Sequence, residues 1–183
     1  MKLRHSPLDA IRHKIAYVTE DRKGNGLVLS QSIKVNTTLA NLTAVSKNTV
    51  LDKDAEYAAA EDYRKRLKTK TPSVEQLVGN LSGGNQQKVL LAKWMFAEPD
   101  ILILDEPTRG IDVGAKYEIY CIINDLAAAG KSVIMISSEL PEVIGMSDRI
   151  YIMNASRIVG EMAASEATQE NIMSMILASG RGD

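Results

Sequence analysis

Apolar and polar residues repeat with two different periods along this chain, and together the two patterns predict an α/β protein. Short alternating or continuous apolar runs predict strands, whereas longer amphipathic runs predict helices. The first predicted strand is "KIAYVTED" (14–21), and a glycine-punctuated loop follows at 24–32. The stretch from Asn36 to about Leu67 reads as helical, and Thr71-Pro72 ends it.

Beyond Leu81, predicted helices and strands take turns. A capped helix runs until Pro99, and "ILILDEP" (101–107) is a continuous apolar run, typical of a parallel strand covered on both faces. The later predicted elements are a helix at 113–130, a strand at 132–138, a short helix at 141–148, a hairpin at 149–162 and a helix at 167–178. This order predicts an α/β core, and the helical stretch before it predicts an inserted lobe.

Composition narrows the function classes. The 183 residues carry 22 Lys and Arg against 23 Asp and Glu, so no basic excess points to nucleic acid as a partner. The single cysteine, Cys121, cannot form an internal disulfide, and its helical apolar surroundings predict a buried packing role. No apolar run is long enough to cross a bilayer and no signal peptide is visible, so we expect a soluble intracellular domain.

One stretch imitates a phosphate-binding loop. "DLAAAGKSVIM" (125–135) ends a helix and begins a strand, whereas a phosphate loop joins a strand to the helix that follows it. Asp125 also stands where the loop needs its first glycine. We therefore interpret Gly130 as a left-handed cap at the end of the helix, and we find no phosphate loop in the chain.

The end of "ILILDEP" is a first candidate for chemistry. Ligands bind at the carboxyl ends of parallel strands, and Asp105 and Glu106 emerge there. Successive side chains on a strand point to opposite faces, so one carboxylate could hold Mg²⁺ while the other orients or deprotonates a water molecule. Taken alone, the pair could equally be an ordinary polar strand end.

"LSGGNQQK" (81–88) is a second and more specific candidate. Ser82 can cap the helix that follows, and Gly83 and Gly84 allow the backbone amides of the first turn to approach an anion closely. The helix dipole also favours negative charge at this end. An ordinary capped helix is the alternative, but two glycines at a helix start are costly without a reason. We therefore predict an anion site.

These strings together resemble a known family. "LSGGNQQK" is similar to the signature motif of the ABC-transporter ATPases, and "ILILDEPTRGIDVGA" resembles their Walker B strand and D-loop. "YVTEDRKGNGL" resembles a Q-loop region. With "SSELPEV", the motifs resemble one subgroup, the C-terminal half of the tandem ATP-binding subunits of bacterial monosaccharide importers (ribose, galactose, xylose and arabinose types). The resemblance covers essentially the whole chain.

In that family two ATPase domains sandwich two nucleotides head to tail, so the phosphate loop of one domain faces the signature helix of the other. The resemblance implies that Ser82, Gly83 and Gly84 contact the γ-phosphate of ATP held by a partner domain. Gln86 and Gln87 would begin the signature helix near that nucleotide, with Gln86 as a cofactor-binding residue.

The resemblance also assigns the acidic residues. Asp105 would serve Mg²⁺, Glu106 would act on the hydrolytic water, and Asp112 in "RGID" would lie at the junction of the two domains. The helical lobe would meet the membrane permease.

The chain departs from the family pattern in three places. Glu20 stands where the family usually has the Q-loop glutamine, and it could still bind Mg²⁺ or reach the permease. Ser138 stands at the place of the switch histidine, where it can donate one hydrogen bond but carries no charge. The phosphate (Walker A) loop is missing, which we interpret as truncation of a longer protein.

We therefore expect a partial P-loop NTPase-like ABC ATPase core. Within 1–183, the helical signature subdomain would span about 30–98, and the α/β core with its C-terminal hairpin and helix would span 1–29 and 99–183. The expected function is ATP binding and hydrolysis that powers monosaccharide import. Alternatively, the chain is a degenerate module that docks to a permease and a partner ATPase without hydrolysing ATP.

The expected cofactors are ATP and Mg²⁺. The expected partners are a second ATPase domain, membrane permease subunits and, indirectly, a sugar-binding protein outside the membrane, with no nucleic acid. The expected location is the cytoplasmic face of the bacterial membrane, as a peripheral protein. Without its own phosphate loop, the chain by itself should bind ATP weakly or not at all.

Overall fold

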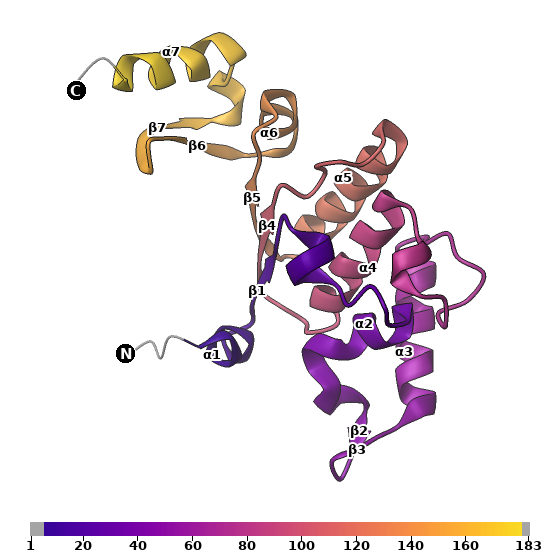
Figure 1. Ribbon diagram of the computed structural model, residues 1–183. Helices are drawn as coiled ribbons and strands as arrows, with labels where there is room; N and C mark the ends of the chain where they lie inside the picture. Colours follow the sequence, from indigo (N-terminus) through magenta and orange to yellow (C-terminus); the bar gives the residue numbers. More distant parts are fainter. Residues whose placement is uncertain (1–5, 181–183) are drawn as a thin grey trace. The chain divides into compact units, whose positions relative to one another are not determined.

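The computed structural model describes residues 6–180, which divide into one compact unit ending at Ile134 and a second beginning at Met135 (Figure 1). Each unit is described by itself. The first opens with the short helix α1 (Pro7–Arg12) and strand β1 (Ile15–Val18). The predicted domain bounds at 30–98 and 99–183 remain a prediction.

A parallel pair of strands forms the centre of the first unit. β1 pairs with β4 (Ile101–Asp105) in register, with Tyr17 opposite Ile103. β5 (Ser132–Ile136) completes the sheet order β1-β4-β5. Leu102 and Leu104 are buried, whereas Ile103 is only half-buried. The strand is therefore covered on both faces, as predicted, but unequally, because the face of Leu102 and Leu104 is buried and the other is only partly covered.

Two neighbouring helices carry the chemistry-bearing segments that follow the lobe and β4. α4 (Gly83–Met95) contacts β1 and α5 (Val113–Ala128), as Figure 1 shows. α5 buries the stripe Ala115, Ile119, Ile122 and Ile123, which repeats with helical spacing. Cys121 lies off that stripe and is exposed, so the prediction that it is buried is wrong.

The end of α5 confirms the interpretation of Gly130. The helix ends at Ala128, Gly130 has φ +81°, and β5 begins two residues later. Only glycine adopts this left-handed conformation without strain. A helix thus enters the "GKS" stretch and a strand leaves it, the reverse of a phosphate loop. Lys131 instead pairs with Asp100, at a distance of 2.9 Å.

The lobe is less continuous than the sequence predicts. α2 (Ile33–Thr38) is followed by the 3₁₀ segment η2 (Leu39–Val45) and a small hairpin, β2 and β3, before α3 (Lys53–Arg66) begins. The hairpin strands cover Ser46–Lys47 and Val50–Leu51. Asn48 and Thr49 take positive φ values of 48° and 69°, which makes a tight turn and interrupts the predicted helix.

A buried asparagine fixes the entrance to the lobe. Asn36 has no exposed surface, and its amide donates to the carbonyls of Val28 and Ser32 at 3.0 Å each. Its Oδ1 accepts from the Val28 amide at 2.8 Å. These bonds join α2 to the loop after η1, a single π-helical turn over Arg22–Gly26.

The second unit is a hairpin with helices. β6 (Arg149–Asn154) pairs antiparallel with β7 (Arg157–Ala163), as the sequence predicts. Ile150, Ile152, Met162 and Ile172 form its core. The remaining elements are α6 (Leu140–Met146), the 3₁₀ turn η4 (Ala164–Glu166) and α7 (Gln169–Ser179). Every helix in 6–180 is too short or too polar to cross a bilayer.

Candidate nucleotide-facing site

The start of α4 presents unpaired backbone donors. Ser82 occupies the N-cap position, and its carbonyl accepts from the Gln86 amide at 2.9 Å. Its hydroxyl makes no capping bond and instead accepts from the Asn85 side chain at 3.0 Å. Within 6–180 nothing accepts from the amides of residues 83–85. Three donors and an exposed hydroxyl therefore remain for an external anion.

The rest of α4 is held by buried polar side chains. Gln86 is 4% exposed, and its Nε2 donates to the carbonyls of Val78 and Leu81, both at 3.2 Å. Val78 belongs to the 3₁₀ turn η3 (Val78–Asn80). Gln86 therefore braces the loop before the helix, and its carboxamide is turned into the lobe. Gln87 is buried as well.

Lys88 braces the same helix on another side. Its side chain is 2% exposed, and Nζ lies 2.7 Å from the Glu118 carboxylate on α5 and 3.0 Å from the Lys68 carbonyl. The hydrogen bond from Lys88 lowers the pKa of Glu118 below its ordinary value. This ion pair fixes the spacing of α4 and α5 near their starts.

The two adjacent acids stand at the carboxyl end of β4. Asp105 accepts a 2.5 Å hydrogen bond from the Tyr17 hydroxyl of β1. That bond, followed by partial burial, raises the pKa of Tyr17. Glu106 has φ +47°, a left-handed conformation that side-chain-bearing residues rarely adopt. Backbone strain of this kind is concentrated at functional sites.

The loop between β4 and α5 passes beside the start of α4. Arg109 forms an exposed ion pair with Glu20. Arg22 donates from Nη1 to the Arg109 carbonyl at 2.9 Å and from Nη2 to the Gly110 carbonyl at 3.3 Å. Glu20, the residue at the predicted Q-loop position, is therefore paired with this loop within the chain itself.

Asp112 caps α5, and its Oδ1 accepts from the Ala115 amide at 2.9 Å. The starts of α4 and α5 meet here, around a polar cavity of about 200 Å³. Its lining includes Ser82, Gly84 and Asp112, which the motifs select, together with Lys70, Asn85 and Glu118, which they do not. The structure therefore brings the signature residues and Asp112 together.

The remaining predicted residue lies in the second unit. Ser138 follows β5 and is exposed. Its neighbour Ser137 accepts from the Glu139 amide at 3.0 Å and hydrogen-bonds the buried Glu142 carboxylate. Ser138 also interacts with another group and is not a free hydroxyl. No group of three or more His, Cys, Asp and Glu side chains in 6–180 is arranged to hold a metal ion.

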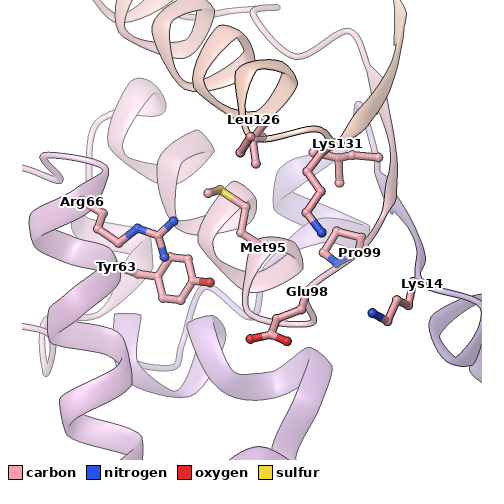
Figure 2. Close-up of a pocket in the computed structure, with 10 residues that line it drawn as sticks. Lys14, Tyr63, Arg66, Met95, Glu98, Pro99, Leu126 and Lys131 are labelled. Carbon is pink, nitrogen blue, oxygen red and sulfur yellow. The ribbon is translucent and has the colours of Figure 1, made fainter.

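A larger cavity of about 320 Å³ lies where α3, α4 and α5 end (Figure 2). Met95, Leu102 and Leu126 give it an apolar floor. Charged and aromatic side chains surround that floor: Lys14, Tyr63, Arg66, Glu98 and Lys131. The guanidinium of Arg66 lies 4.9 Å from the centroid of the Tyr63 ring.

Sequence patterns missed several of these residues. Tyr17 and Asn85 hydrogen-bond predicted site residues, and Arg22 lies beside Gly83. In the sequence, each of the three has an ordinary structural explanation. Tyr17 looks like an alternating strand residue, and Arg22 looks like part of a solvated charge run. For Tyr17 a usable signal existed, since parallel pairing of the two predicted strands places alternate residues on one face.

Comparison with known proteins gives a consistent picture. A family model described as "ABC transporter" matches residues 2–109. The L-arabinose transport ATP-binding protein of Geobacillus stearothermophilus is 62% identical over 167 residues, which are 91% of this chain and 33% of that protein. A ribose import ATP-binding protein of Bacillus cereus is 54% identical over 170 residues, which are 93% of this chain and 34% of that protein. The chain spans about a third of the length of these relatives.

Solved structures share the fold. A nucleotide-free ATP-binding cassette of an ABC transporter superposes with a TM-score of 0.74 at 17% identity, covering 97% of this chain and 72% of that one. A dimeric cassette bound to ADP and phosphate gives 0.70 at 21% identity, covering 84% and 64%. These matches confirm the expected ABC ATPase fold.

Proposed function

Because this chain belongs to the ABC transporter family, we propose that it is part of an ATP-binding and ATP-hydrolysing subunit that powers monosaccharide import and presents α4 to ATP held by a partner domain. The observation that carries the proposal is the start of α4. Three backbone amides without acceptors and the exposed Ser82 hydroxyl lie at the positive end of a helix dipole.

The donors at this helix start fit a terminal phosphate better than other anions. Amides in one helical turn can bond several oxygens of a single phosphate group, and the hydroxyl adds another donor. Gly83 and Gly84 allow close packing around this helix start, because a Cβ on either would crowd Arg22 or Ala115. Ser82, Gly83 and Gly84 thus form the proposed γ-phosphate contact, and Asp112 beside them forms part of the junction with the partner domain.

Asp105 and Glu106 form the chain's own half of a second site. Mg²⁺ in nucleotide sites is held by one or two carboxylates, with water and phosphate oxygens completing its shell. Asp105 fits that role, because Tyr17 bonds one oxygen and thereby orients the carboxylate. Mg²⁺ supplies positive charge that offsets charge developing on the transferred phosphoryl group. Glu106 orients and deprotonates the attacking water.

This second site is proposed to turn over slowly. Glu20 is paired with Arg109, and Ser138 can stabilise developing charge only through a neutral hydrogen bond. We therefore assign the two nucleotide sites unequal roles. The chain's α4 serves a competent site, whereas the site built on Asp105 and Glu106 contributes less to the rate.

The permease is proposed to contact the lobe at the cavity in Figure 2, where α3 meets the ends of α4 and α5. An apolar floor with a charged surround is typical of a surface that receives a short protein segment. The subunit would then sit peripherally on the cytoplasmic face of the membrane. A sugar-binding protein outside the membrane would choose the sugar, so its contact with this chain is indirect.

The test is a chimera in which this chain replaces the matching third of the G. stearothermophilus arabinose subunit, assembled with its permease. Ser82→Ala removes a phosphate donor but no capping bond. It should therefore leave the unfolding temperature nearly unchanged and lower kcat about 10²–10³-fold. Ser30→Ala, at an exposed loop position, is the matched control.

Glu106→Gln should reduce kcat less than Ser82→Ala does. Equal losses would contradict the unequal roles of the two sites. An unsubstituted chimera that assembles with the permease but hydrolyses no ATP would instead support the docking module, and would contradict the proposed activity.

A further inference from the structure

Arg22 joins three segments that are far apart in the sequence. Its side chain leaves η1 and donates to the Arg109 and Gly110 carbonyls, 87 and 88 residues away. Its Nη2 also lies 3.0 Å from the position that a Cβ on Gly83 would occupy. One guanidinium therefore bonds the segment after β1 to the loop before α5 and lies beside the opening of α4.

The base of Arg22 is fixed. Asp21 caps the turn by accepting from the Gly24 amide at 2.9 Å. At the other end, Lys93 of α4 donates to the Gly26 carbonyl at 2.9 Å. Gly26 packs so closely on Leu90 that an added Cβ would lie 3.1 Å from it. η1 is thus anchored to α4, and it presents the Arg22 side chain from a defined place.

The tip of Arg22 is held by carbonyls alone. Among residues 6–180 it has no carboxylate partner, and Nε is buried without an acceptor. Burial lowers the pKa of Arg22 below its ordinary value. A desolvated cation without a counter-charge lowers the stability of the fold. Its presence therefore suggests a role beyond holding the loop in place. The planar fork suits two successive carbonyls, which a lysine cannot bond in the same plane.

We propose that Arg22 is a positioning residue for phosphate binding, because its guanidinium holds the Arg109–Gly110 backbone against Gly83 and so sets the opening of α4. This inference rests on the proposed function, in which that opening receives a partner's phosphate. Gly110 supports it, because its φ of +68° turns its carbonyl within reach of Arg22 in a conformation that favours glycine.

Hydrogen exchange on this chain tests the positioning without any nucleotide. Arg22→Met should speed exchange about 10-fold or more at the hydrogen-bonded amides of Gln86 and Arg109, which flank the opening of α4 and the turn at Gly110, because the bonds that hold this loop against α4 are lost. Lys23→Met, in the same turn but exposed and without a described partner, is the matched control and should change nothing there. Unchanged exchange in Arg22→Met would overturn the proposal.

The arabinose chimera tests the link to catalysis. Arg22→Met should lower kcat per bound nucleotide about 10–100-fold while the Kd for ATP stays the same, because the partner's loop anchors ATP and only geometry is lost. Arg22→Lys should recover part of the rate. A changed Kd with an unchanged kcat, or full activity, would overturn the proposal. An unsubstituted chimera without activity would count against the proposed function only. The hydrogen-exchange experiment on the chain by itself would still show whether Arg22 holds the loop.

Discussion

Gly84 of α4 and Ala115 of α5 cross so closely that a Cβ on Gly84 would lie 2.5 Å from the Cβ of Ala115. Real side-chain carbons do not approach to that distance. The second glycine of the signature string is therefore required by helix packing. This contact sets the spacing between the two helix starts that line the polar cavity.

Gly84→Ala should destabilise the chain by about 1–3 kcal/mol, because the added methyl overpacks a buried crossing. Denaturant unfolding measures the loss. Gly145→Ala, at an exposed position of α6 with open space around it, is the control and should be neutral or stabilising by up to about 1 kcal/mol. Adding Ala115→Gly to Gly84→Ala should recover part of the loss. If the double substitution recovers nothing, the crossing is not the cause.

The chain by itself should not bind ATP tightly. Its free amides meet the terminal phosphate only, whereas a phosphate loop normally supplies the main cradle and a lysine. Titration calorimetry with MgATP should therefore show no micromolar binding. A micromolar, Mg²⁺-dependent isotherm would contradict the assignment of the phosphate contacts to a partner's nucleotide.

The stability of the fold should decrease at acidic pH because of the Lys88–Glu118 ion pair. The pKa of Glu118 is lowered in the folded chain by Lys88, so the pair contributes fully above the unfolded pKa of about 4.3. The contribution disappears as the pH falls through the lower, folded value. Glu118→Gln should therefore lower the unfolding temperature at pH 7, and its difference from the unsubstituted chain should shrink as the pH falls below about 4. A difference that stays constant from pH 7 to pH 3 would rule this out.

The larger cavity should govern permease assembly. Arg66→Glu reverses a charge at the cavity, whereas Lys65→Glu reverses its neighbour, which does not line it. In the chimera, Arg66→Glu should reduce co-purification with the permease about 10-fold, because charge complementarity at the edge of an interface is lost. Lys65→Glu should have little effect. Equal effects of the two substitutions would place the permease contact elsewhere.

The sequence predicted correctly those elements that depend on interactions between neighbouring residues. The strand at 101–105, the helix from 83, the hairpin at 149–163 and the cap at Gly130 all follow from periodicity or turn chemistry. Predictions failed where another group or conformation replaced the one that the local pattern favoured. Ser82 takes the N-cap position, but Asn85 occupies its hydroxyl. The predicted lobe helix is broken by the turn at Asn48 and Thr49.

The order of elements, the two glycines at a helix start and the paired acids at a strand end are properties of neighbouring residues, so the sequence by itself determined them. Which distant groups meet was decided only by the tertiary structure. The pairing of β1 with β4 brings Tyr17 to Asp105, and the anchoring of η1 on α4 carries Arg22 to Gly110. Both contacts join residues 88 positions apart, and no local pattern encodes the register or packing that creates them.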